Sequence, residues 1–142
     1  MGQSAAELVG EHDFTSFETV PSTRRSKVRT IYSAEVFRHS GYDDAADAEV
    51  WLEVVGNGFL YNMVRIITGS LVMVGCGKQK PEWIREVIAA RSRPAAGPTA
   101  PPQGLVLVSI DLDLNLDFNL DLSGSNSPPS ANPAPAWQEF PN

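Results

Sequence analysis

The chain has 142 residues, a formal net charge of −6 at pH 7 and 42% hydrophobic residues. This length allows one domain with a modest core, and the acidic balance excludes a generally basic nucleic-acid-binding protein. The charge is uneven, because all 11 Lys and Arg precede residue 94, whereas the residues after position 110 carry only acidic charges. Local basic clusters in the nearly neutral body can therefore still contact RNA phosphates.

The cysteine count, the N-terminus and the apolar runs predict a cytoplasmic protein. One cysteine, Cys76, excludes an intrachain disulfide, and two His with one Cys are too few and too scattered for a metal site. The start of the chain lacks the charged and apolar regions of a secretory signal. The apolar run after Gly58 is interrupted by Arg65 and is shorter than the ~20 residues of a membrane span. We therefore expect no membrane segment and no metal.

The first predicted element is a helix over residues 3–9 (QSAAELV), which Gly10 would end. Residues 11–17 (EHDFTSF) predict an irregular connector that Phe14 and Phe17 anchor. The adjacent His12 and Asp13 could suggest acid–base chemistry. We expect them instead to tie the connector to the core.

Two strands follow, and they predict an antiparallel hairpin with a loose turn at residues 40–48. Residues 28–39 predict a strand with two alternating faces. One face has Tyr32, Ala34 and Val36, and the other has Ser33, Glu35 and Phe37. Residues 49–56 place Val50, Leu52 and Val54 on one side.

Residues 60–74 have the length and composition of a buried helix. Asn62, Arg65 and Gly69 are spaced i, i+3 and i+7, which puts them on one narrow face, while the other positions face protein. A buried guanidinium is costly unless a carboxylate meets it. Arg65 therefore either reaches the surface or presents its charge to a partner anion.

A second helix is predicted from Pro81, a residue that suits the first helical turn, to about residues 91–93. A Pro- and Gly-rich loop follows, and residues 105–110 (LVLVSI) predict a strand. The fold class is therefore α+β, with a small antiparallel sheet covered by helices over residues 1–110. Residues 111–122 alternate Asp or Asn with Leu or Phe, and residues 123–142 predict a disordered Ser- and Pro-rich tail.

Basic residues gather at two places. Four of them lie in the loop before the first strand and at its start: Arg24, Arg25, Lys27 and Arg29. Lys78 and Lys80 precede the second long helix. Each group is a candidate for phosphate contacts to RNA, and a solvated surface is the alternative.

Four collinear segments resemble one family. Residues 10–17 (GEHDFTSF), 56–78 (GNGFLYNMVRIITGSLVMVGCGK), 81–93 (PEWIREVIAARSR) and 95–110 (AAGPTAPPQGLVLVSI) resemble the C-terminal half of bacterial-type tRNA pseudouridine synthase A. The resemblance implies isomerisation of uridine to pseudouridine in the tRNA anticodon stem-loop, without cofactor or metal, by a homodimer. The target nucleotide would be flipped out of the stack.

The same resemblance assigns two residues of the site. Arg65 matches the arginine that pairs with the family's catalytic aspartate, and Leu105 matches an apolar residue that packs near the target base. Ile66 departs from the family, which usually has asparagine there.

The aspartate itself lies in an Arg-Thr-Asp-Ala-Gly-Val-His motif, which this sequence lacks. We therefore expect a chain that supplies one wall of the active site, without the N-terminal catalytic half, and that is inactive by itself. The alternatives are a non-catalytic tRNA-binding or dimerisation module and an inactive truncated fragment.

Overall fold

The computed structural model describes residues 1–19, 26–39 and 49–112 of the chain. The chain divides into two units, Met1–Leu107 and Val108–Asn142, and the fold below belongs to the first. The expectations for Arg24 and Arg25, for the turn at 40–48 and for the tail 123–142 lie outside the described residues. So does the alternating segment 111–122, apart from its first two positions.

The sheet has three antiparallel strands in the order β1-β2-β3. The predicted hairpin is confirmed as β2 (Val28–His39) and β3 (Glu49–Gly56). The prediction of an irregular connector at residues 11–17 is wrong for its first part, because Gly10–Asp13 forms β1. This strand pairs with β2 from Gly10↔Ile31 to Asp13↔Val28. A strand of four mostly polar residues has too little alternation to be recognised locally, so backbone pairing with β2 defines it.

A β-bulge changes the face that the first part of β2 presents. Ile31 pairs with Gly56 and Ser33 with Val55, so Tyr32 is the extra residue between them. Ile31 and Ala34 are consequently both buried, whereas Tyr32 is 61% exposed. The prediction that Tyr32 and Ala34 share a face is therefore wrong, because the extra residue puts Tyr32 on the exposed side.

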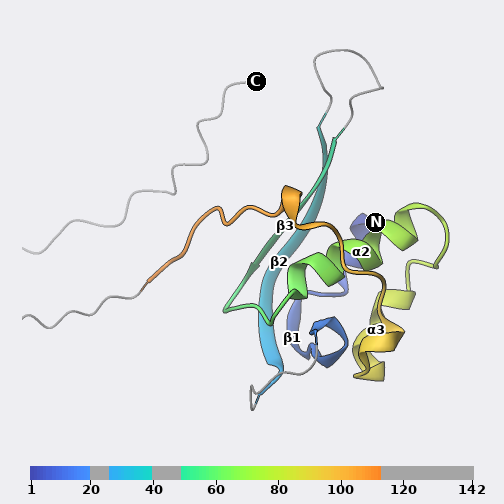
Figure 1. Ribbon diagram of the computed structural model, residues 1–142, viewed down its shortest axis with the longest axis horizontal. Helices are drawn as coiled ribbons and strands as arrows, with labels where there is room; N and C mark the ends of the chain where they lie inside the picture. The colour runs from blue at the N-terminus through green and yellow to red at the C-terminus, as the bar shows by residue number, and fades with distance from the viewer. Residues whose placement is uncertain (20–25, 40–48, 113–142) are drawn as a thin grey trace, which may run out of the picture. The chain divides into compact units, whose positions relative to one another are not determined.

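The core lies between the sheet and the helices, which gather on one side of it in Figure 1. The helices are α1 (Gly2–Ala6), α2 (Met63–Gly75) and α3 (Trp83–Ala90). Their buried residues pack with β2 and with Phe14 and Phe17, which are fully buried as predicted. The largest contribution comes from α2, through Met63, Ile66, Ile67, Leu71 and Val74.

The helix bounds differ from the predictions at their ends. α1 ends at Ala6, and Gly10, which was predicted to end it, opens β1 with a φ of 113°. α2 begins at Met63, because Asn62 has a left-handed conformation that cannot continue a helix. α3 ends where Arg91 takes the same conformation.

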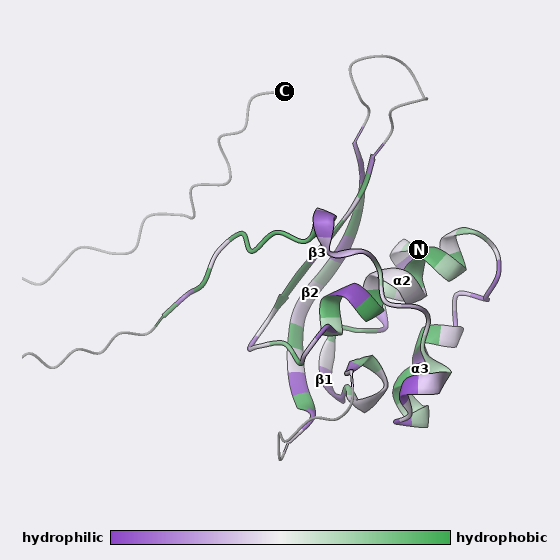
Figure 2. Cartoon of the chain, viewed as in Figure 1, coloured by the Kyte–Doolittle hydropathy of each residue, from purple (hydrophilic) through white to green (hydrophobic). Residues whose placement is uncertain are grey.

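The predicted strand at residues 105–110 is not formed among the described residues. These residues follow the short 3-10 helix η3 (Pro102–Gly104), and none of them is buried. Figure 2 shows the run as mostly apolar, and Val106 and Val108 are about three quarters exposed. A strand needs a neighbour for its backbone N–H and C=O groups, and the described residues provide none here.

No helix within the described ranges has both the length and the apolar composition needed to cross a membrane.

Candidate active site

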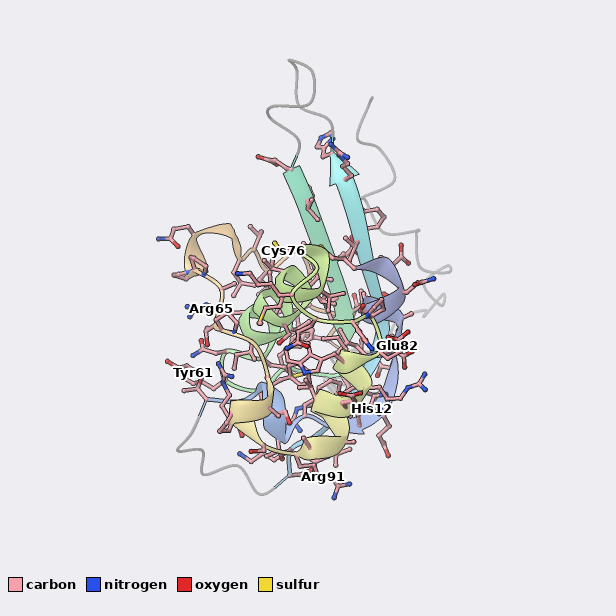
Figure 3. All side chains as sticks on the ribbon, turned by 90° about the vertical axis from the view of Figure 1, so that its right-hand side faces the viewer. His12, Tyr61, Arg65, Cys76, Glu82 and Arg91 are labelled. Carbon is pink, nitrogen blue, oxygen red and sulfur yellow. The ribbon has the colours of Figure 1, made fainter. Side chains whose placement is uncertain are left out.

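Arg65 lies in the first turn of α2, and its guanidinium is fastened at two points. Nε donates a hydrogen bond to the carbonyl oxygen of Ala100 at 2.8 Å, and Nη1 donates to Asn62 Oδ1 at 2.9 Å. The side chain is partly buried, so it neither lies in the core nor extends freely into solvent. Figure 3 shows Arg65 and Tyr61 on the same side of the molecule.

Asn62 connects Arg65 to the segment before β2. Its Nδ2 donates to Thr19 Oγ1 at 3.1 Å, and the Thr19 N–H donates to the Tyr61 carbonyl at 3.2 Å. The φ of Asn62 is 61°, a conformation that asparagine tolerates better than most residues. The backbone turn at the start of α2 thus directs the Asn62 amide between Thr19 and Arg65.

The described residues place no carboxylate on Arg65. The ion pairs among them join Lys27 to Glu18, Arg85 to Glu7 and Arg91 to Asp13. Nη2 of Arg65 has no hydrogen-bond partner in this part of the chain. A planar guanidinium held in this way can receive a carboxylate with two parallel hydrogen bonds. That Arg65 pairs with an aspartate remains a prediction.

Leu105 is on the segment that also carries Ala100. Its N–H donates to the Pro102 carbonyl at 3.0 Å, which closes η3, and the side chain is 52% exposed. Contact between Leu105 and a target base also remains a prediction.

The candidate RNA-binding residues have different surroundings. Lys27 forms an ion pair with Glu18, which is only 1% exposed, so Lys27 already neutralises a buried charge. Arg29 donates to the backbone carbonyls of Ser26 and Val28. Lys78 and Lys80 are exposed and line a shallow concavity with Glu82 and Glu86, two acids that reduce its attraction for phosphate.

Asp13 has a structural role, as the sequence indicated. Its Oδ1 accepts hydrogen bonds from Thr15 Oγ1 at 2.6 Å and from the Thr15 N–H at 3.0 Å. The Thr15 hydroxyl bond, with help from nearby Arg91 and Lys27, lowers the pKa of Asp13 below its usual 3.8 despite some desolvation. His12 bonds to the Val9 carbonyl and packs edge-on against Phe14. In Figure 3 His12 lies on the opposite side from Arg65.

Sequence reasoning placed Asn62 on the same face as Arg65, but it missed Thr19 and Ala100. Thr19 and Ala100 carry no pattern that distinguishes them, and they lie 43 residues from Asn62 and 35 from Arg65. The contact between Asn62 and Arg65 agrees with their i, i+3 spacing. Within the described ranges, no cluster of three or more His, Cys, Asp or Glu could hold a metal ion.

Comparison with known proteins gives one consistent answer. The tRNA pseudouridine synthase A of Brevibacillus brevis is 50% identical to this chain over 107 residues, which are 75% of this chain and 41% of that protein. The namesake proteins of Colwellia psychrerythraea and Vibrio vulnificus are each 43% identical over 111 residues, 78% of this chain and 40% and 39% of theirs. The chain thus spans about two fifths of the relatives that it matches. A model of the tRNA pseudouridine synthase family matches residues 4–113, so the chain belongs to this family.

Proposed function

We propose that this chain supplies one wall of a tRNA pseudouridine synthase active site, which isomerises uridine to pseudouridine in the anticodon stem-loop. The aspartate that begins the reaction comes from sequence that corresponds to the part of the relatives outside the match. Arg65 pairs with this aspartate and orients it, and Leu105 packs beside the target base. Because the matched region is about two fifths of each relative, the complete activity needs more than residues 4–113.

The fastening of Arg65 is the observation that carries this proposal. Its bonds to Ala100 and Asn62 restrict the rotamers of a long side chain before any ligand arrives. A long cationic side chain loses much rotamer freedom when it binds, and the fold has already restricted this one. Such preorganisation is useful where a carboxylate must meet a reacting atom in a defined orientation.

The chemistry assigns distinct tasks to the two sides of the site. The bond between uracil N1 and ribose C1′ breaks, the base rotates, and C5 bonds to C1′. The C5 proton is lost and N1 gains one, so the net change is an isomerisation that needs no external reactant. The residues of this chain orient the carboxylate through Arg65 and shield the flipped base through Leu105.

The tRNA contacts and the assembly complete the proposal. Arg24, Arg25, Arg29, Lys78 and Lys80 contact phosphates, and Lys27 contributes less because Glu18 already engages it. The complete enzyme is a cytoplasmic homodimer with the tRNA spanning both subunits.

Tritium release from C5-labelled uridine in unmodified tRNA tests the reaction. We expect no release from this chain alone, and release after the unmatched part of the Brevibacillus brevis relative is added or fused. In the reconstituted enzyme, Arg65→Met should lower the rate about 100-fold, because the aspartate is no longer held in orientation. Arg65→Lys should recover only part of the rate, since an ammonium cannot form the planar fork.

The matched control is Arg85→Met, which removes an exposed arginine that pairs with Glu7 on the surface. Its release rate should equal that of the unsubstituted enzyme. Release by this chain alone would contradict the divided site. Salt-sensitive tRNA binding without release after reconstitution would favour a binding module, and an aggregating chain that the added part does not rescue would favour an inactive fragment.

A further inference from the structure

Residues 97–100, here named the strap, run along residues 65–70 of α2 and form three hydrogen bonds with them. The Gly97 N–H donates to Ser70 Oγ at 2.9 Å. The Ala100 N–H donates to the Arg65 carbonyl at 3.0 Å, and Arg65 Nε donates back to the Ala100 carbonyl at 2.8 Å. One residue of the strap therefore holds both the backbone and the guanidinium of Arg65. In Figure 1 the strap is the part of the yellow-to-orange chain that passes along α2.

The strap can lie this close only because there is a glycine on each side of the contact, Gly69 in α2 and Gly97 in the strap. A Cβ added at Gly69 would be 1.8 Å from the carbonyl oxygen of Pro98, a backbone atom that cannot rotate away. A Cβ added at Gly97 would be 2.8 Å from Ser70 Cα. Glycine in a helix interior lowers the stability of the helix. At position 69 this cost accompanies the close approach of the strap.

The polar groups where the strap contacts α2, here named the seat, form hydrogen bonds on both sides of the strap. Ser70 is fully buried, and its hydroxyl donates to the Ile66 carbonyl at 2.8 Å while it accepts from Gly97. On the other side, Arg93 donates from Nη1 to the Gly97 carbonyl at 2.9 Å and from Nη2 to Thr99 Oγ1 at 3.2 Å. The position of the Ala100 carbonyl is therefore fixed by contacts several residues away from Arg65.

We propose that Gly69 and Ser70 are positioning residues for Arg65. They seat the strap so that the Ala100 carbonyl meets Nε, and this bond together with Asn62 leaves the Nη2 edge of the guanidinium for a carboxylate. The part that this geometry plays in catalysis rests on the proposed function. The hydrogen bond from Arg65 Nε to the Ala100 carbonyl does not depend on the proposed function, and it can be measured in this chain without substrate.

The first test is NMR of the arginine Nε–Hε groups in the full 142-residue chain labelled with ¹⁵N. Hε of Arg65 should exchange with water more slowly than Hε of exposed Arg38, because a carbonyl accepts it. Gly69→Ala forces the strap away from α2, and the exchange protection of Arg65 should fall about 10-fold, the worth of one hydrogen bond. Gly104→Ala is the matched control, because a Cβ there meets nothing within 4 Å, and protection should be unchanged.

Ser70→Ala provides a second route if Gly69→Ala does not fold. It keeps the glycine contact and removes the acceptor for Gly97, so protection should fall by a smaller factor. Full protection of Arg65 in a folded Gly69→Ala chain, or in Ser70→Ala, would overturn the positioning role. An unprotected Arg65 in the unsubstituted chain would also overturn it.

The second test uses the reconstituted enzyme and separates this inference from the proposed function. Gly69→Ala should lower kcat for tritium release about 10-fold and leave KM for tRNA unchanged, because the seat acts on the carboxylate and not on the RNA. If Arg65→Met leaves release unchanged, the proposed function fails while the NMR result stands. If Gly69→Ala raises KM and leaves kcat unchanged, the seat serves RNA binding and the positioning role fails.

Discussion

At the scale of single residues, Arg65 differs from an ordinary arginine of a helix surface. Such a side chain usually lays its apolar stem on the protein and keeps its head in water. Arg65 instead gives two N–H groups to fixed oxygens, one on the backbone and one on an amide that is itself held by Thr19. The site is therefore restricted before a ligand binds, and the restriction comes from neighbours that are remote in sequence.

Asp13 allows a pH prediction at this scale. Because its pKa is lowered in the fold, the folded chain binds the Asp13 proton less tightly than the unfolded chain does. Asp13 therefore stabilises the fold above its usual pKa of 3.8, and this contribution is lost as the pH falls through the lowered value. Asp13→Asn should lower the free energy of unfolding by about 1 kcal/mol at neutral pH.

Urea unfolding at several pH values measures this effect. The difference between the original chain and Asp13→Asn should narrow as the pH falls below 3.8. Glu11→Gln, which removes an exposed carboxylate two residues away, is the control and should show a much smaller difference at neutral pH. A difference for Asp13→Asn that grows in acid would contradict the assigned hydrogen bonds.

At the scale of elements, the strands show how pairing overrides local pattern. The sequence of β2 alternates well, yet one extra residue at Tyr32 reverses the faces on either side of the bulge. The segment 105–110 has a stronger strand pattern than β1, but only β1 has a partner in the described residues. A strand is thus a property of two segments, and a pattern describes only one of them.

The exposed run at residues 105–110 leads to the second prediction. We expect a neighbouring strand to cover its apolar side chains and to pair with its backbone groups in the complete enzyme. Amides 106–110 should exchange rapidly with deuterium in this chain alone. After the unmatched part of the Brevibacillus brevis relative is added, their exchange should slow by a factor of about 10 or more.

Hydrogen-exchange mass spectrometry measures this protection. Amides of α2, which are already bonded within the helix, serve as the internal control and should change little. Reconstituted tritium release without any new protection at 106–110 would show that this run stays uncovered in the active enzyme.

At the scale of the whole molecule, the net charge restricts where a polyanion can bind. A net charge of −6 opposes a polyanion, so attraction must be local to the basic clusters. The two neighbouring cations Lys27 and Arg29 differ in this respect. Lys27 forms an ion pair with the buried Glu18. Among the described residues, Arg29 donates its side-chain hydrogen bonds to backbone carbonyls, so its charge is available to a phosphate.

The third prediction contrasts these two residues. Arg29→Gln should reduce the slope of log affinity for tRNA against log salt by about 1, with little change in stability. Lys27→Gln should instead lower the free energy of unfolding by about 1 kcal/mol or more, because it removes a cation that pairs with the buried carboxylate of Glu18. Filter binding of tRNA to the reconstituted enzyme at several salt concentrations, together with urea unfolding, checks both. A larger loss of salt dependence in Lys27→Gln than in Arg29→Gln would reverse the assignment.

The sequence by itself determined the α+β class, the β2–β3 hairpin, the two long helices and the position of Arg65 in an otherwise apolar helix. Each of these rests on periodicity or composition within one continuous segment. Only the tertiary structure decided that β1 joins the sheet, that Tyr32 faces outward and that Arg65 is held by Ala100 and, through Asn62, by Thr19. These features depend on backbone groups and on close approaches between segments far apart in the chain. Every residue has a backbone carbonyl, so the identity of residue 100 does not show that its carbonyl accepts a hydrogen bond from Arg65.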